Sequence, residues 1–266
     1  MQIVTGGIGF FDSGIGGLNV LRACVPALQD YTYYYYGDTE HAPYGNLKTQ
    51  EIFRYTLAAF EGFERLNVQA AVVACNTATA VCIDELRARF SFPIVGTEPA
   101  LFTAAKQGGR VLVLCTRATY ESIRFQTLCN LARIRYPNSD IKALPCDGLA
   151  GAIERANLMD KSRDFSAYFP KMETDSVVLG CTHYSFVKDE IETFYNCPSY
   201  DGNEGVVARL KSIIKEKKGR EVVSKECFDA VFLEKSPFNP LSVYFLSTGK
   251  MVIKTKYEQM FGIKNR

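Results

Sequence analysis

The sequence predicts an α/β fold built on parallel sheets, and two observations support this prediction. Short apolar runs that end in small or polar residues recur along the chain, and each is followed by a segment with helical spacing of apolar residues. This alternation is typical of parallel strands joined by helices. The pattern occurs in both halves of the 266-residue chain, a length that corresponds to one large domain or two small ones.

The first half of the chain contains three predicted strands with intervening helices. The strands are expected at 8–11, 31–36 and 70–74, and the helices begin at Leu18 and Glu51. A glycine-rich turn, 12–17, joins the first strand to the first helix. Apolar residues at helical intervals define the second helix, at Ile52, Phe53, Leu57, Phe60 and Phe63.

The second half repeats this order. Strands are expected at 111–114 and 176–179, one helix is marked by Ile123, Leu128, Leu131 and Ile134, and another is expected at 186–195. The less regular C-terminal part predicts a strand from Val243 to Leu246, and 215–220 has the composition of a solvated helix end that runs into a loop. No long linker or low-complexity tract separates the halves, so two domains are expected to pack closely.

Composition and charge exclude several classes of protein. The chain has 31 Lys and Arg against 29 Asp and Glu, and a net charge of +2 lacks the basic field of a non-specific nucleic-acid binder, so no nucleic-acid partner is expected. There is no run of 18 apolar residues, and the start lacks the basic and apolar regions of a signal peptide. We therefore expect a cytoplasmic protein without a membrane partner.

The cysteines and histidines argue against disulfides and metal sites. Nine cysteines are an odd number spread over a long chain, which favours reduced thiols over a disulfide framework. No C-x-x-C pair occurs, and the only histidines are His41 and His183, so no metal is expected. His41 lies in a loop and is expected to be incidental.

Two cysteines lie in matched positions, 106 residues apart. Cys75 and Cys181 each follow an apolar run directly, and residues that can form hydrogen bonds come after each of them. In parallel α/β sheets the ligand crevice lies outside the carboxyl ends of the strands, where both cysteines are expected. Two such halves that face each other place one thiol on each side of a ligand.

Two opposed thiols suit reversible proton transfer, because a reference pKa of about 8.5 makes both thiol and thiolate accessible near neutral pH. If one removes a proton from carbon and the other returns one to the opposite face, the centre is inverted without a cofactor. Such a site also needs donors for the developing negative charge and partners for the thiols. Candidate donors are Ser13, Asn76, Thr77 and Thr182, and candidate partners are Asp12 and His183.

Other interpretations of these residues stay open on spacing alone. A cysteine after a buried strand is commonly a small apolar core residue. The turn at Asp12-Ser13-Gly14 is also suited to begin a helix or to bind an anion. A thiol-based redox or metal sensor is a further alternative, although it lacks C-x-x-C spacing and sufficient histidines.

Six motifs, in this order along residues 8–210, resemble the glutamate racemases. They are Asp12 to Leu18, Gly37-Asp38 with Pro43-Tyr44-Gly45, Ala74 to Ala78, Glu98-Pro99, Thr116 to Thr119, and Leu179 to Tyr184. The resemblance implies a cofactor-independent isomerase that interconverts L- and D-glutamate and supplies D-glutamate for bacterial peptidoglycan. Aspartate racemases share parts of the cysteine motifs, so another acidic amino acid is an alternative substrate. A non-catalytic amino-acid-binding module on the same fold is a second alternative.

The resemblance also implies roles for individual residues. Cys75, assisted by Asp12, is the implied base for D-glutamate, and Cys181, assisted by His183 and Glu154, is the implied base for L-glutamate. The implied substrate-binding residues are Ser13, Pro43, Tyr44, Gly45, Asn76, Thr77, Thr116, Thr119 and Thr182.

The implied architecture is two pseudosymmetric parallel-sheet α/β domains with the active site between them. The first domain is expected to comprise 1–98 and about 206–266, and the second 99–205. Glutamate is the implied small-molecule partner, and the resemblance is compatible with a homodimer.

Overall fold

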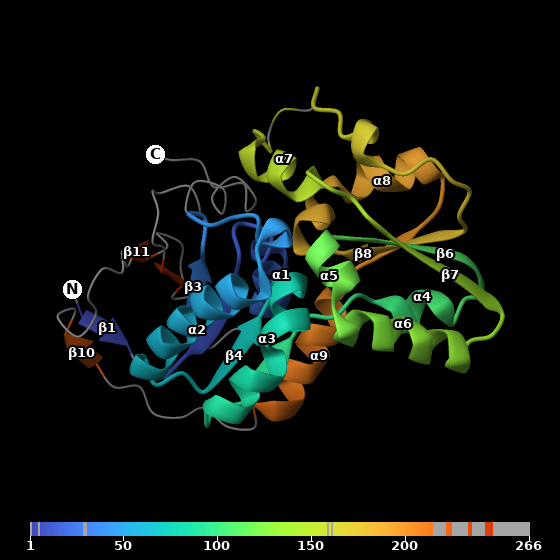
Figure 1. Cartoon of the computed structure of the whole chain (residues 1–266). Helices are drawn as coiled ribbons and strands as arrows, with labels where there is room; N and C mark the ends of the chain where they lie inside the picture. The colour runs from blue at the N-terminus through green and yellow to red at the C-terminus, as the bar shows by residue number, and fades with distance from the viewer. Residues whose placement is uncertain are drawn as a thin grey trace.

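The computed structural model describes residues 2–4, 6–28, 31–158, 160, 162–214, 222–224, 234–235 and 243–246. Their strands form two larger sheets, each covered by helices, and a small two-stranded sheet. Figure 1 shows the two larger sheets beside each other, with β3 and β4 on one side and β6, β7 and β8 on the other. We call the first sheet with its helices the first lobe, and the second sheet with its helices the second lobe.

The first lobe is built on a six-stranded sheet in the order β11-β12-β3-β2-β4-β5. The strands are β2 (Ile8–Asp12), β3 (Tyr33–Gly37), β4 (Ala70–Val73), β5 (Ile94–Gly96), β11 (Glu234–Lys235) and β12 (Val243–Leu246). β12, β3, β2, β4 and β5 run parallel, and β11 pairs antiparallel with β12. The carboxyl ends of β2 and β4 therefore lie next to each other at one edge of the sheet.

The second lobe is built on a four-stranded parallel sheet in the order β7-β6-β8-β9. The strands are β6 (Gly109–Cys115), β7 (Ser139–Pro145), β8 (Ser176–Gly180) and β9 (Ser199–Tyr200). The small sheet pairs β1 (Gln2–Val4) with β10 (Val222–Ser224), antiparallel. The fold is thus the predicted parallel α/β arrangement, present twice.

Helices follow the strands in both lobes. The α-helices are α1 (Leu18–Cys24), α2 (Thr49–Arg65), α3 (Asn76–Arg89), α4 (Leu101–Ala105), α5 (Arg117–Glu121), α6 (Ile123–Arg135), α7 (Leu149–Arg155), α8 (Lys188–Tyr195) and α9 (Asn203–Ile213). Short 3-10 helices are η1 (Val25–Ala27), η2 (Tyr44–Asn46), η3 (Ser166–Tyr168) and η4 (Thr182–Val187). Polar side chains define some helix starts: the Thr116 hydroxyl accepts from the Thr119 N–H, and the Ser122 hydroxyl accepts from the Phe125 N–H.

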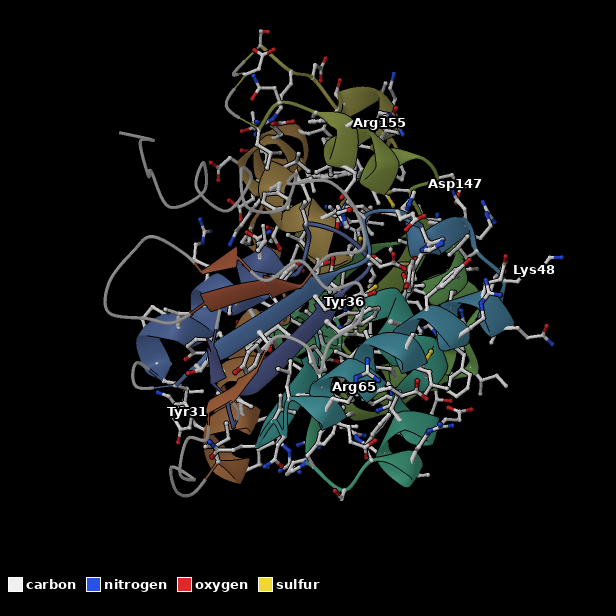
Figure 2. All side chains as sticks on the ribbon, turned by 90° about the vertical axis from the view of Figure 1, so that its left-hand side faces the viewer. Tyr31, Tyr36, Lys48, Arg65, Asp147 and Arg155 are labelled. Carbon is white, nitrogen blue, oxygen red and sulfur yellow. The ribbon has the colours of Figure 1, made fainter. Side chains whose placement is uncertain are left out.

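The tyrosine-rich strand β3 shows how the first sheet is buried on both faces. Tyr34 packs in the cluster that contains Phe60 and Phe63 of α2, whereas Tyr33 and Tyr35 pack in the opposite cluster with residues of α1. All three tyrosines are completely buried. Alternation of side chains across a strand explains why one run of tyrosines supplies both layers. Figure 2 labels Tyr36 on this strand and Lys48 just before α2.

Most predicted elements are present, with shifted ends. The strand predicted at 31–36 lies at Tyr33–Gly37, and the predicted strand at Val243–Leu246 is β12. The helix predicted at 186–195 begins at Lys188, because η4 occupies the preceding residues. The predicted helix end at 215–220 lies outside the described residues. Within the part of the chain that is described, no helix combines the length and apolar character needed to cross a membrane.

Candidate active site

The Cys75 thiol lies at the N-terminal end of α3, directly after β4. Its sulfur accepts from the Ala78 N–H at 3.4 Å, and the thiol donates to the Ser13 hydroxyl at 3.5 Å. The residue is only 4% exposed. Burial raises the pKa of Cys75 to about 11, and nearby Asp12 also raises it, whereas the bonds to Ser13 and Ala78 act in the opposite direction. The resting thiol is therefore protonated near neutral pH.

Asp12 connects the two lobes at the end of β2. One carboxylate oxygen accepts from the Gly14 N–H at 2.9 Å, and the other accepts from the Thr182 hydroxyl at 3.1 Å. Thr182 belongs to the second lobe, so this carboxylate lies where the carboxyl ends of both sheets meet. Burial raises the pKa of Asp12, while the charge of His183 and the backbone N–H groups of the turn lower it.

The Cys181 thiol follows β8 and is flanked by an imidazole and a carboxylate. Its sulfur lies 3.8 Å from Nδ1 of His183, and Nε2 of His183 lies 2.5 Å from an oxygen of Glu154 in α7. Burial works to lower the pKa of His183, but the Glu154 carboxylate and the Cys181 sulfur prevail and hold this pKa well above its ordinary value of 6.5. His183 can therefore carry a proton next to Cys181.

The glycines of the turn before α1 allow the two lobes to touch. A Cβ on Gly16 would lie 2.3 Å from the Thr182 hydroxyl and 2.7 Å from Nδ1 of His183, and a Cβ on Gly14 would lie 2.7 Å from a Glu154 oxygen. Contacts this short leave no room for any side chain. The Asp12–Gly17 turn is therefore the surface against which the second lobe places its acid-base groups.

A cluster of hydroxyl groups joins the lobes on the other side of Cys75. The Thr77 hydroxyl lies 2.9 Å from that of Thr116 and 3.2 Å from that of Thr119, and these two are 3.0 Å apart. Gly45 packs over Thr116, since a Cβ on Gly45 would lie 2.8 Å from the threonine Cβ. The site thus has several neutral donors and acceptors beside the thiols.

The structure brings most of the predicted site residues together. Asp12, Ser13, Cys75, Thr182, Cys181, His183 and Glu154 are connected by the contacts above, and Thr77, Thr116, Thr119 and Gly45 form the adjacent hydroxyl cluster. Asn76 turns its amide to the backbone oxygen of Thr97 at 3.3 Å. Tyr44 is buried, and Pro43 lies beside Gly151 at the rim.

Sequence reasoning missed three polar residues near the site. The Asn19 amide on α1 contacts the backbone oxygens of Gly16 and Thr182, both at 3.4 Å, so it also ties the lobes together. Nδ1 of His41 lies 2.8 Å from an oxygen of Asp38, so this loop histidine has a buried polar partner. A polar residue between Leu18 and Val20, on a helix face expected to be apolar, was the available signal for Asn19.

The other cysteines that the structure describes form no disulfide. The eight cysteines that the structure describes are free thiols, and all but Cys197 are buried. Among all the residues that the structure describes, no group of three or more His, Cys, Asp or Glu side chains is placed to hold a metal ion. The groups that the structure places at this interface are two protonatable sulfurs, two carboxyl groups and an imidazole.

Comparisons with known proteins identify the family of this chain. Residues 16–210 match the model of the Asp/Glu/Hydantoin racemase family. A glutamate racemase of Clostridium acetobutylicum is 38% identical over 79% of this chain and 85% of its own length. The crystal structure of Escherichia coli glutamate racemase with L-glutamate and an activator, UDP-MurNAc-Ala, superposes with a TM-score of 0.72 at 26% identity, covering 91% of this chain and 99% of the other.

A structure of glutamate racemase from Campylobacter jejuni shares the fold, with a TM-score of 0.74 at 22% identity over 97% of this chain and 99% of that one. The matched range begins at Gly16, after Asp12 and Ser13, spans both lobes, and contains both thiols, Glu154 and His183. The chain therefore belongs to the Asp/Glu/Hydantoin racemase family.

Proposed function

We propose that this protein is a glutamate racemase that interconverts L- and D-glutamate by proton transfer between two cysteines, without a cofactor. The observation that carries the proposal is the convergence of Cys75 and Cys181 on one buried interface, where Asp12 of the first lobe meets Thr182 of the second. The two sulfurs are close enough for Cys181 to contribute to the raised pKa of Cys75. The choice of glutamate as the substrate rests on the relatives, which are named glutamate racemase.

In the proposed reaction, the resting Cys75 thiol first passes its proton to Asp12, the resulting thiolate removes the α-proton of D-glutamate, and the Cys181 thiol then supplies a proton to the opposite face. With L-glutamate, Cys181 acts as the thiolate and Cys75 as the thiol that supplies the proton. Asp12 acts with Cys75, and His183 acts with Cys181. Glu154 holds the imidazole in place. Because both sulfurs are nearly buried, the proposed reaction takes place away from bulk water, where oriented hydrogen bonds stabilise developing charge most strongly.

The proposed substrate contacts are the groups next to the thiols. The residues are Ser13, Pro43, Tyr44, Gly45, Asn76, Thr77, Thr116, Thr119 and Thr182. The serine and threonine hydroxyls and the backbone N–H groups suit a ligand with two carboxylates, and Tyr44 contributes through its backbone because its hydroxyl donates to Asp38. The proposed biological role is the supply of D-glutamate for peptidoglycan, in the cytoplasm.

The proposed domain division follows the predicted limits, with 1–98 and about 206–266 in the first domain and 99–205 in the second. Two features support it. The strands of the second sheet lie between Gly109 and Tyr200, and α9 packs with α1 of the first lobe through Val206 and Leu210.

The test of the proposed function is proton NMR in D₂O. Purified protein is incubated with L-glutamate or D-glutamate, a reducing agent and no added cofactor, while circular dichroism follows optical activity. Loss of the α-proton signal together with loss of optical activity, from either enantiomer, is the expected result. Activity confined to aspartate would assign a different substrate, and glutamate binding without α-proton exchange would overturn catalysis.

We further propose that a second copy of this chain docks on α6, which makes the protein a homodimer. Ile123, Leu131 and Ile134 are 86%, 51% and 79% exposed, and their spacing, with Thr127 between them, places them on one stripe of the helix. The residues that α6 buries are instead Phe125, Cys129 and Ala132. Clustered aliphatic side chains in water mark a contact surface.

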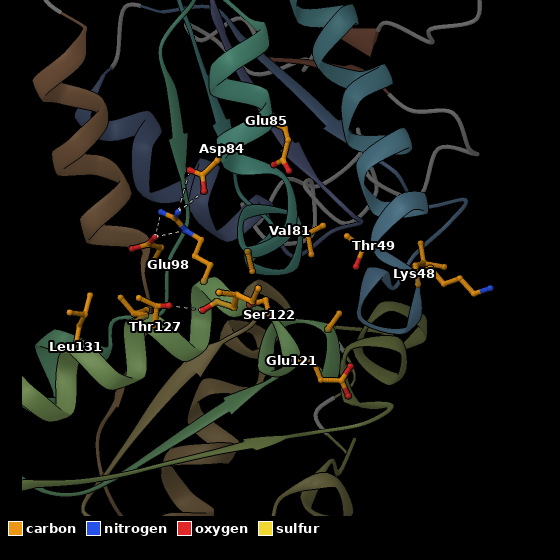
Figure 3. Close-up of a pocket in the computed structure, with 16 residues that line it drawn as sticks. Lys48, Thr49, Val81, Asp84, Glu85, Glu98, Glu121, Ser122, Thr127 and Leu131 are labelled. Atoms are coloured by element: carbon orange, nitrogen blue, oxygen red, sulfur yellow. Dashed lines mark hydrogen bonds and ion pairs between the residues drawn. The ribbon is translucent and has the colours of Figure 1, made fainter.

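The charges around α6 favour a copy of the same chain as the occupant. A groove of about 1190 Å³ is lined by residues of α3, α5 and α6 and of the start of α2. Figure 3 shows Glu85 of α3 and Glu121 of α5 on it, with Leu131 further along α6. Exposed Arg133 and Arg135 lie in the last turn of α6. Antiparallel pairing about a two-fold axis brings the end of one α6 surface that carries Glu85 and Glu121 to the end of the other that carries Arg133 and Arg135. The surface is therefore complementary to a second copy of itself.

Sedimentation velocity tests the dimer. The wild-type protein should sediment as a dimer, and Leu131→Asp and Ile134→Asp should sediment as monomers with unchanged circular dichroism. Phe194→Asp is the matched control, because Phe194 is also an exposed apolar residue, at 38%, but lies on α8. A monomeric wild-type protein, or a dimer that survives both α6 substitutions, contradicts this interface.

A further inference from the structure

The buried Asp38 side chain holds together the loop between β3 and α2 by contacting two other residues of that loop. Asp38 follows β3, is 2% exposed, and donates its backbone N–H to the Asp12 carbonyl oxygen at 3.0 Å. Its side chain accepts from the Tyr44 hydroxyl at 2.6 Å and lies 2.8 and 3.0 Å from Nδ1 of His41. One carboxylate thus fixes two points of the loop, which lies between the labelled Tyr36 and Lys48 in Figure 2.

The His41 imidazole is held in turn by α2. Its ring stacks on that of Tyr55, with centroids 3.7 Å apart and an interplanar angle of 18°. Arg54 lies 4.7 Å from the centre of the same tyrosine ring and donates to its hydroxyl at 2.8 Å. The orientation of the imidazole toward Asp38 is therefore set by its contact with α2.

Tyr44 connects Asp38 to the Pro43-Tyr44-Gly45 segment, which is among the proposed substrate contacts. Its ring is 1% exposed and packs in the same cluster as Cys75, with its centroid 6.1 Å from that of Phe11. The next residue, Gly45, lies directly over Thr116 of the second lobe. Movement of Tyr44 therefore moves the backbone that covers the hydroxyl cluster.

We infer that Asp38 and His41 are positioning residues that hold the Pro43-Tyr44-Gly45 segment in the geometry that binds substrate. Neither residue has to touch the substrate, because both act through the Tyr44 hydroxyl and the loop backbone. The part of this inference that concerns substrate rests on the proposed function. The part that concerns the loop stands on the hydrogen bonds alone, so the two are measured separately.

The first measurement is hydrogen exchange of the backbone amides of 44–47, which needs no activity. His41→Leu should increase their exchange about tenfold, since a hydrogen bond to a charged group is lost. His41→Asn, whose amide can replace the Nδ1 donor, should restore most of the protection. Glu40→Gln is the matched control, because Glu40 is an exposed neighbour in the same loop. Unchanged exchange in both His41 variants would overturn the anchoring.

The second measurement is steady-state kinetics with both enantiomers of glutamate. His41→Leu should raise KM about tenfold while kcat changes less than threefold, because the loop affects binding rather than the acid-base groups. Tyr44→Phe should raise KM similarly, and the double variant should be no worse than either single one, since both act through Asp38. An unchanged KM in His41→Leu, or additive effects, would refute the role in binding. If the wild-type protein itself is inactive, the proposed function fails, and hydrogen exchange still decides the loop anchoring.

Discussion

Cys75 and Cys181 occupy equivalent places in their lobes but have different surroundings. Both follow a buried parallel strand, β4 or β8. Cys75 caps an α-helix and contacts a hydroxyl and a backbone N–H, whereas Cys181 precedes a 3-10 helix and contacts an imidazole backed by a carboxylate. The repeated fold therefore fixes where the sulfurs lie, and the residues around them fix how each handles a proton.

In a racemase, thermodynamics limits which kinetic quantities can reveal this difference between the two thiols. The two enantiomers have equal free energy, so kcat/KM must be the same in both directions whatever surrounds each sulfur. Chemical asymmetry between the thiols can appear only in kcat and KM separately, in isotope effects, and in partial reactions. The predictions below use those quantities.

Removal of either thiol should have the largest effect. Cys75→Ala and Cys181→Ala should each lower racemisation about 10³-fold, within the range of positioned acid-base groups. In D₂O, Cys181→Ala should still exchange the α-proton of D-glutamate and Cys75→Ala that of L-glutamate, because the remaining thiol can remove and return a proton on its own side. NMR measures both. Exchange of the opposite enantiomer would reverse the assignment of the two bases.

Loss of the carboxylate behind His183 should have an intermediate effect. Glu154→Gln should lower kcat/KM tenfold to hundredfold in both directions, since hydrogen bonds to charged groups are worth roughly 1.5–3 kcal/mol. The α-deuterium isotope effect should increase for L-glutamate and decrease for D-glutamate, because only the step at Cys181 is slowed. Glu173→Gln serves as the control, as Glu173 is exposed and pairs with Arg110. Equal isotope effects would mean that Glu154 supports both thiols alike.

The pH dependence of Cys75 should show the smallest change. Its thiol should titrate near pH 11, measured as the ultraviolet thiolate absorbance of wild type minus Cys75→Ser. Ser13→Ala should move this titration upward, because the hydroxyl favours the thiolate. Since the unfolded thiol ionises near its ordinary value of 9.0, the free energy of unfolding should fall as the pH rises from 9 toward 11. A midpoint at or below 9 would show that burial does not control this thiol.

The elements could be predicted from the sequence because apolar periodicity records burial directly. It placed β2, β4, β6, β8 and β12, and it placed both thiols at strand ends. The same periodicity did not show which face of α6 is buried. Ile123, Leu131 and Ile134 marked the helix correctly, but they point to solvent, and the core side of α6 is made by Phe125, Cys129 and Ala132.

Contacts between distant residues could not be predicted in this way. His183 was a candidate from its place beside Cys181, but the role of Glu154 came from resemblance alone, and no local pattern shows that the two side chains lie 2.5 Å apart. The contact of His41 with Asp38 is local, because the turn after β3 brings the two side chains together, but a loop histidine has no periodic signal that would predict it. Tertiary structure, rather than propensity, decides such pairs.

The packing of α9 on α1 also has a consequence for synthesis on the ribosome. All strands of the second sheet are complete once Tyr200 has been made, but the core beside α1 also needs Val206 and Leu210, and β12 of the first sheet comes later still. Multidomain chains commonly fold from the N-terminus onward. In this chain the first lobe begins first but is completed last. The apolar face of α1 therefore stays partly uncovered in the nascent chain until α9 has been synthesised and can pack on it.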